Sequence, residues 1–235
     1  RDFHALLAVY KITCGGQKDL WFSPFQAEWG MALQPVPLFP LGAGLFPDGL
    51  LALRIFEVRY LDMVKRALKE KTGFGVILLS EGSEVRAPDK TERFHSVGTM
   101  AEIVDADALQ PALLLLRCKG GERFRVEASH QAKYGLWMGD VVPIANDPVV
   151  AIPPDLQPAA NRLGQLIAAF QKKGASEEQI PIYRPYRLDE CGWVANRWAE
   201  MLPFSMTQRQ ELLEEMNPEA RLRAVVGSMG DLFEE

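Results

Sequence analysis

Proline and glycine are concentrated in the segment from Ala32 to Leu68, where they restrict the structures that the chain can form. Four prolines and three glycines stand among apolar residues before Ile55, and a helical pattern follows directly. Because proline donates no backbone hydrogen bond, a sheet tolerates it at strand starts and at edges. The segment therefore predicts a short strand from Pro35, a turn through 42–49, and a second strand that leads into a helix.

Apolar runs bounded by turn-forming residues extend this β pattern to Val150. They predict a closed or nearly closed sheet, in which the second strand spans 50–55 and later strands span 75–79, 98–105, 113–118, 123–128 and 136–142. Gly120 and Gly121 can adopt the positive φ angles of a tight turn. We therefore expect a hairpin at this pair, with Phe124 and Val126 on one face of its second strand.

Helical periodicity interrupts the β region once and dominates after residue 153. Residues 57–70 repeat apolar side chains at helical spacing, with charged side chains opposite, which predicts one inserted helix. The C-terminal part predicts a bundle of helices. One spans 159–172, and a second spans 190–202 after an N-cap at Asp189. A third starts at a capping box of Ser205 and Gln208, and a fourth starts at Asn217-Pro218. These patterns predict an α+β fold.

The two patterns divide the chain into a β domain at 31–150 and a helical domain at 151–235. Residues 1–30 fit neither pattern. Met31 stands directly before the proline-rich segment, and we interpret it as the natural start. On that interpretation residues 1–30 are an appended segment, either loosely ordered or packed through its aromatic side chains Trp21, Phe22, Phe25 and Trp29.

Charge and cysteine content disfavour several classes of protein. The formal net charge is -5, and residues 31–150 hold 14 Lys and Arg against 15 Asp and Glu, so we do not expect nucleic acid as a partner. The three cysteines lie far apart without a C-x-x-C motif, which favours a reducing cytoplasm over a disulfide framework or a zinc site. No apolar stretch approaches the roughly 20 residues that a membrane-spanning helix needs, so no membrane association is expected.

The sequence also lacks familiar catalytic and ligand-binding motifs. The pattern G-x-G-x4-G at 42–49 contains a proline and precedes a strand, so it indicates a turn rather than a phosphate-binding loop. His4, His95 and His130 do not have metal-ligand spacing, and no G-x-S-x-G or Walker A motif occurs. We expect no catalytic residue, no metal and no cofactor.

Three motifs together give the chain a family resemblance. They are PVPLFPLGAGLFPDGLLALRIFEVRYLDMVKRAL at 35–68, FHSVGTMAEI at 94–103 and GGERFRV at 120–126. In this order they resemble the LON N-terminal domain, which is found at the front of Lon proteases and also as a stand-alone protein. The later W-x4-W-x3-L-P at 193–203 and the segment 210–222 resemble the helical half of that domain, so the likeness spans roughly residues 35–232.

The resemblance implies a PUA-like β pseudo-barrel with one inserted helix, followed by a C-terminal helical bundle. In Lon proteases this module helps to recognise unfolded or tagged protein substrates, while catalysis lies in other domains. The implied function is a noncatalytic module that binds unfolded or extended polypeptide segments. A separate protease or chaperone and a second copy of the chain are further implied partners. We expect the site in a concave, partly apolar groove between the two domains.

Six residues are candidates for contact with a bound peptide: Leu45, Phe46, Leu50, Arg54, Arg59 and Tyr60. An exposed Phe46 would dock an apolar side chain of the peptide, whereas a buried one would pack at an end of the barrel. Arg59 and Tyr60 would hold a peptide backbone or carboxylate. Alternatively, an ion pair between Glu57 and Arg54, or a reach of Arg59 to another strand, locks the strand-to-helix junction.

Two other functions stay open at this point. A hydrolase or peptidase with an unrecognised site would need carboxylate, His and Ser side chains that converge in one pocket. An RNA-binding PUA-like domain would use Arg123 and Arg125, which we expect to point outward beside Phe124.

Overall fold

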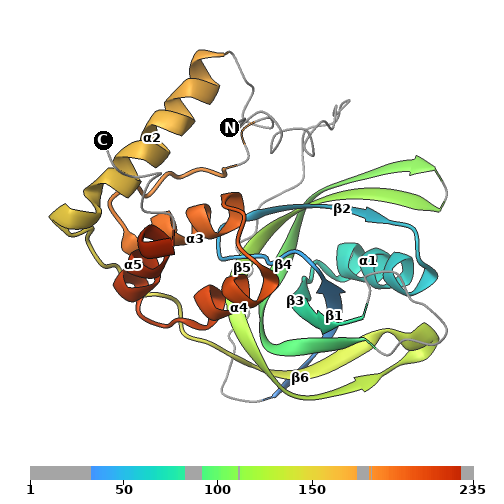
Figure 1. Cartoon of the computed structure of the whole chain (residues 1–235). Coiled ribbons are helices and arrows are strands. Elements are labelled where there is room, and N and C mark those ends of the chain that lie inside the picture. The colour runs from blue at the N-terminus through green and yellow to red at the C-terminus, as the bar shows by residue number, and fades with distance from the viewer. Residues whose placement is uncertain (1–32, 83–91, 111, 174–179, 181, 229–235) are drawn as a thin grey trace.

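The computed structural model describes residues 33–82, 92–110, 112–173, 180 and 182–228, and the predicted extension at 1–30 lies outside them. Strands with one inserted helix come first along the chain, and helices follow (Figure 1). In chain order they are β1 (Gln34–Leu41), β2 (Leu50–Ile55), α1 (Val58–Glu70), β3 (Phe74–Glu81), β4 (Arg93–Gln110), β5 (Leu113–Gln131), the 3-10 turn η2 (Lys133–Gly135), β6 (Trp137–Pro143), the 3-10 turn η3 (Pro154–Leu156), α2 (Gln157–Lys172), α3 (Cys191–Met201), α4 (Met206–Glu214) and α5 (Pro218–Ser228).

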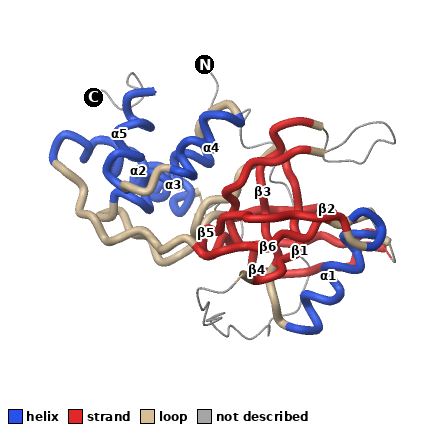
Figure 2. Tube along the Cα trace, turned by 90° about the horizontal axis from the view of Figure 1, so that it is seen from below, coloured by secondary structure: helices blue, strands red, loops and turns tan. Residues whose placement is uncertain are grey.

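The strands form one sheet that closes on itself. Their order is β2-β5-β4-β3-β1-β6, and β6 pairs in addition with β5. The pair of β1 and β3 is parallel, and the other pairs are antiparallel. Figure 2 shows the strands gathered on one side of the molecule and α2 to α5 on the other. The predicted α+β fold, a pseudo-barrel followed by helices, is confirmed.

β5 is 19 residues long and pairs with three other strands. Its first part, up to Lys119, pairs with β2, and its second part, from Phe124, pairs with β6. β4 runs along its other edge. β5 therefore joins the closed part of the barrel to the strand β2.

The hairpin that we expected at Gly120 and Gly121 is wrong. β5 continues through both glycines, and the chain reverses between Gln110 and Leu113 instead. Gly120 instead allows the backbone of the loop at Phe46 to lie directly against β5. A Cβ on Gly120 would lie 2.0 Å from the carbonyl oxygen of Phe46. A glycine pair inside a strand can mark such an approach as well as a turn.

α1 confirms the predicted inserted helix and packs against the barrel. Its apolar face, which includes Tyr60, Leu61 and Val64, joins Phe39 and Phe74 in one buried cluster. The ring of Tyr60 stacks on that of Phe39 with centroids 4.0 Å apart.

The helical part has a second, larger core. α3 lies at its centre and is buried on all sides from Cys191 to Ala199. The capping box of Ser205 and Gln208 is confirmed at the start of α4. The predicted N-cap at Asp189 is wrong by one position, because Glu190 occupies that place.

Asn217 begins α5 as predicted. Its side-chain oxygen accepts hydrogen bonds from the backbone N–H groups of Glu219 and Ala220, at 3.0 and 3.2 Å. These bonds satisfy donors that have no partner within the helix.

Candidate functional site

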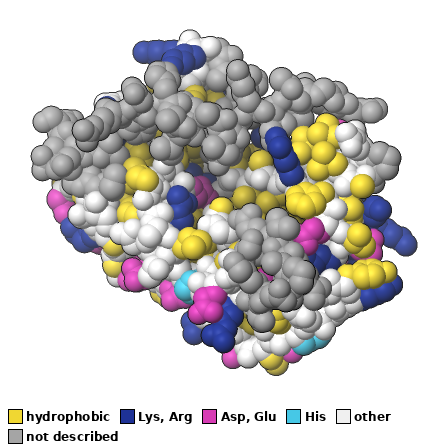
Figure 3. Space-filling model, turned by 45° about the vertical axis from the view of Figure 1, so that its right-hand side comes forward, with side chains coloured by type: hydrophobic (Ala, Val, Ile, Leu, Met, Phe, Trp, Pro, Cys, Tyr) yellow, Lys and Arg dark blue, Asp and Glu magenta, His cyan; other side chains and the backbone are white. Residues whose placement is uncertain are grey.

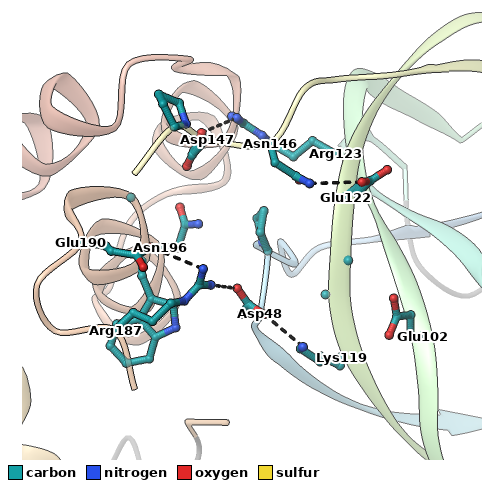
Figure 4. A pocket seen from close by; sticks show the side chains of 16 residues that line it. Asp48, Glu102, Lys119, Glu122, Arg123, Asn146, Asp147, Arg187, Glu190 and Asn196 are labelled. Atoms are coloured by element: carbon teal, nitrogen blue, oxygen red, sulfur yellow. Dashed lines mark hydrogen bonds and ion pairs between the residues drawn. The ribbon is translucent and has the colours of Figure 1, made fainter. Parts of the chain in front are cut away.

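A cleft of about 610 Å³ lies where the barrel meets the helical part (Figure 4). Loop 47–48, β4 and β5 form one wall, and segments 146–148, 187–190 and α3 form the other. The lining residues are Pro47, Asp48, Glu102, Lys119, Gly120, Gly121, Glu122, Arg123, Asn146, Asp147, Pro148, Arg187, Glu190, Gly192, Trp193 and Asn196. The groove was expected to be partly apolar; half of the residues that line this cleft carry a charge, and ion pairs join its two walls.

Asp48 connects the two walls of the cleft (Figure 4). Its carboxylate pairs with Lys119 from β5 at 3.1 Å and with Arg187 from the segment before α3. Arg187 also pairs with Glu190 at 3.4 Å. Arg187 and Asp48 keep 38% and 28% of their side chains exposed, so a ligand can reach them.

Asp147 binds two buried arginines at the cleft. Its carboxylate accepts hydrogen bonds from Arg123 at 2.6 Å and from Arg221 at 2.5 Å. Arg123 also donates to the carbonyl oxygen of Leu213 at 2.9 Å, and Arg221 donates to Asn196 at 3.0 Å. The expectation that Arg123 points outward is wrong, because its guanidinium is buried between the barrel and the helices. Burial, and the nearby charge of Arg221, lower its pKa despite Asp147.

A second buried arginine contact ties loop 46–49 to α3. Arg197 donates to the backbone carbonyl oxygens of Pro47, at 2.7 Å, and of Asp48. Its neighbour Glu200 pairs with it at 3.2 Å and accepts a hydrogen bond from the backbone N–H of Phe46 at 3.3 Å. Burial raises the pKa of Glu200 to about 7, although Arg197 opposes this.

Glu200 should make stability depend on pH. Because its pKa is higher in the folded than in the unfolded chain, its contribution falls as pH rises from about 4.5 to about 7. We expect Glu200→Gln to remove this fall, which amounts to about 3 kcal/mol as an upper limit. Urea unfolding of both proteins at pH 5 and pH 7.5 measures it, and an unchanged pH dependence in the variant would contradict the assignment.

Glu102 is the lining carboxylate that makes no hydrogen bond or ion pair within the described residues. It lies half-buried on β4, and Figure 4 shows it apart from the joined side chains. Burial raises its pKa, Lys119 opposes this, and the charges of Asp48 and Glu122 reinforce it. A ligand group that donates a hydrogen bond or carries positive charge would find an acceptor there.

Arg59 has a structural role at the strand-to-helix junction, where it contacts other segments of the chain. Its guanidinium binds both carboxylate oxygens of Glu92, at 2.8 and 3.2 Å, and donates to Glu57 at 3.0 Å and to the carbonyl oxygen of Gly135 at 3.2 Å. Burial works against its charge, but the hydrogen bond to Glu92 and nearby charges outweigh burial and raise its pKa. Tyr60 is buried beneath it, whereas Arg54 is exposed.

Leu45 and Phe46 are 2% and 1% exposed, which favours packing for both residues. Leu45 belongs to the barrel core, and Phe46 belongs to the core of the helical part. These adjacent residues therefore fix the loop before β2 to both halves of the molecule. Leu50 lies half-buried at the start of β2. The structure does not gather the six candidate residues in one site.

Sequence reasoning did not single out Asp147, Arg187 or Glu102. Their positions in loops and on a strand give no periodic signal. One signal could have pointed to the cleft. The apolar sequence of α3 contains Asn196 and Arg197, and polar side chains that are buried in a helix require partners on neighbouring segments.

The two thiols in the described residues are poorly suited to nucleophilic chemistry. Burial raises the pKa of Cys118 to about 12 and also raises that of Cys191. No group of three or more His, Cys, Asp or Glu side chains that could hold a metal ion occurs in the described ranges. Of the helices described, none is long and apolar enough to cross a bilayer.

The fold combines a pseudo-barrel with one inserted helix, a helical part beside it and a cleft at their junction. The ATP-dependent protease La (LON) substrate-binding domain matches residues 35–230. The chain belongs to this family, as its motifs predicted.

Solved structures agree with this assignment. A Lon N-terminal domain protein from Xanthomonas campestris is 31% identical with a TM-score of 0.65, over 83% of this chain and 98% of that one. The N-terminal domain of the Mycobacterium avium complex Lon protease is 16% identical with a TM-score of 0.54, over 84% and 99% of the two chains, and shares the fold. A comparison with curated protein sequences gave no match.

Proposed function

We propose that the protein is a noncatalytic recognition module that binds unfolded or extended polypeptide segments in the cleft between its two parts. The cleft itself carries the proposal, because it lies at the junction of both halves of a substrate-binding domain. Ion pairs centred on Asp48 and Asp147 hold its walls in place. A preformed cleft lowers the entropy lost on binding.

The chemistry of the lining suits polar contacts with a peptide backbone. Carboxylates accept from backbone N–H groups, and Arg187 and Lys119 can donate to backbone carbonyls. Among the described residues that line the cleft there is no Ser, Thr, Cys or His, which supports binding rather than catalysis. Handover to a separate protease or chaperone in the cytoplasm fits such a module.

Binding can be tested with fluorescein-labelled casein, an unfolded acidic protein, by fluorescence anisotropy. We expect saturable binding that Arg187→Glu weakens by about tenfold, because the variant places a repulsive charge in the lining of the cleft. The matched control is Arg66→Glu, since Arg66 is 77% exposed on α1, outside the cleft. Equal weakening by both variants would show that only net charge matters.

Gel electrophoresis of the casein after incubation tests the noncatalytic part of the proposal. We expect the probe to stay intact without ATP and without another protein. Cleavage that copurifies with the chain would instead support the hydrolase alternative.

A further inference from the structure

β2 is a strand with one free edge. Within the described ranges it pairs with β5 and with no other strand, in the register Leu50 with Lys119 through Ile55 with Leu114. β6 reaches β5 only from Phe124 onward, so it does not continue beside β2. Within the described ranges, β2 therefore leaves one edge of the sheet unpaired, and residues 102–110 of β4, which pair with β5 alone, leave another.

The ladder shows which backbone groups face outward. The N–H of Gly120 donates to the carbonyl oxygen of Gly49 at 2.9 Å, so this carbonyl faces β5, while the N–H of Gly49 donates to Phe46 in the turn. Because hydrogen-bonded pairs alternate along an antiparallel ladder, Leu51, Leu53 and Ile55 use their N–H and C=O groups toward β5. The same groups of Leu50, Ala52 and Arg54 then point away from β5, along the free edge.

The outer face of this edge is accessible and leads into the cleft. Ala52 and Arg54 are exposed, Phe56 just beyond the strand is 52% exposed, and Arg54 makes no ion pair or hydrogen bond with a described residue. Lys119, opposite Leu50 in the register, lines the cleft. Apolar and basic side chains also gather on the face that Figure 3 brings forward, on the side of α1.

We propose that an extended segment of a bound polypeptide adds to the free edge of β2 as a further strand and continues into the junction cleft. This inference rests on the proposed function and specifies how the polypeptide is held. Backbone hydrogen bonds to Leu50, Ala52 and Arg54 would give affinity with little dependence on sequence, which unfolded substrates require. Arg54 favours a bound segment that places an acidic side chain opposite it. Phe56 favours apolar side chains at the neighbouring positions of that segment.

A proline at position 52 tests the edge directly. Ala52→Pro removes an outward N–H and places a ring on the edge, while the hydrogen bonds toward β5 stay intact. We expect casein binding to weaken by at least about tenfold with a nearly unchanged melting temperature. The control is Leu33→Pro, at an exposed position outside the edge. Binding by Ala52→Pro within about twofold of the wild type would overturn the inference but leave the cleft proposal standing.

A second measurement uses the unaltered protein and covers the case in which Ala52→Pro does not fold. The probe is a labelled peptide of about ten alternating Val and Thr residues with a central Glu. A second version carries N-methyl groups on alternate amides of one edge. Strand addition predicts that methylation weakens binding by at least about tenfold. Equal affinity of the two peptides, or binding of casein without binding of either peptide, contradicts strand addition. A protein that binds no casein at all contradicts the proposed function as well.

Discussion

Replacing Asp147 with asparagine is expected to lower the free energy of unfolding by about 3–5 kcal/mol. Asp147 is the carboxylate shared by Arg123 and Arg221, whose side chains are 2% and 1% exposed. The amide cannot neutralise either guanidinium, so two buried charges lose their counterion, and such a loss costs far more than an exposed ion pair contributes. Urea unfolding monitored by tryptophan fluorescence measures the change.

The matched control is Asp155→Asn. Asp155 also pairs with an arginine, Arg223, at 2.5 Å, but 59% and 47% of their side chains are exposed. We expect only a small change there. A similar loss of stability in both variants would show that the burial of the Asp147 contacts has no special role.

Arg59→Met is the second variant with a large expected effect, again about 3–5 kcal/mol. Methionine keeps the aliphatic stem, so the variant chiefly removes the charge. Glu92, with 6% of its side chain exposed, would retain one hydrogen bond from the described residues, that from Trp137 at 2.7 Å. The junction of β2 and α1, the segment at Glu92 and the turn at Gly135 would lose their common contact.

Arg54→Met provides the comparison from the same sequence cluster. Arg54 is exposed and makes no ion pair with a described residue, so we expect a change within about 0.5 kcal/mol. If Arg59→Met leaves stability unchanged but weakens casein binding, Arg59 is a peptide-binding residue and its structural assignment is wrong.

Local patterns predicted the elements well. The inserted helix, the capping box at Ser205 and the start of α5 at Asn217 rest on short-range rules, and each is confirmed. The pair Gly120-Gly121 shows where such rules fail. A turn and a close backbone approach both require glycine, and only the position of Phe46, 74 residues earlier, distinguishes them.

The cleft could not be predicted residue by residue for the same reason. Asp48, Lys119, Asp147 and Arg187 come from four separate segments, and their meeting depends on how the helices dock on the barrel. The motifs predicted a site between the two parts because they identified the family. They could not predict that ion pairs would join its two walls.

Amide hydrogen exchange with and without casein tests the central claim most directly, because it reports where a bound polypeptide covers the protein. We predict slower exchange along β2 and in segments 118–123 and 186–193, with α1 and α2 unchanged. Protection confined to α1, α2 or the far side of the barrel would contradict recognition in the cleft.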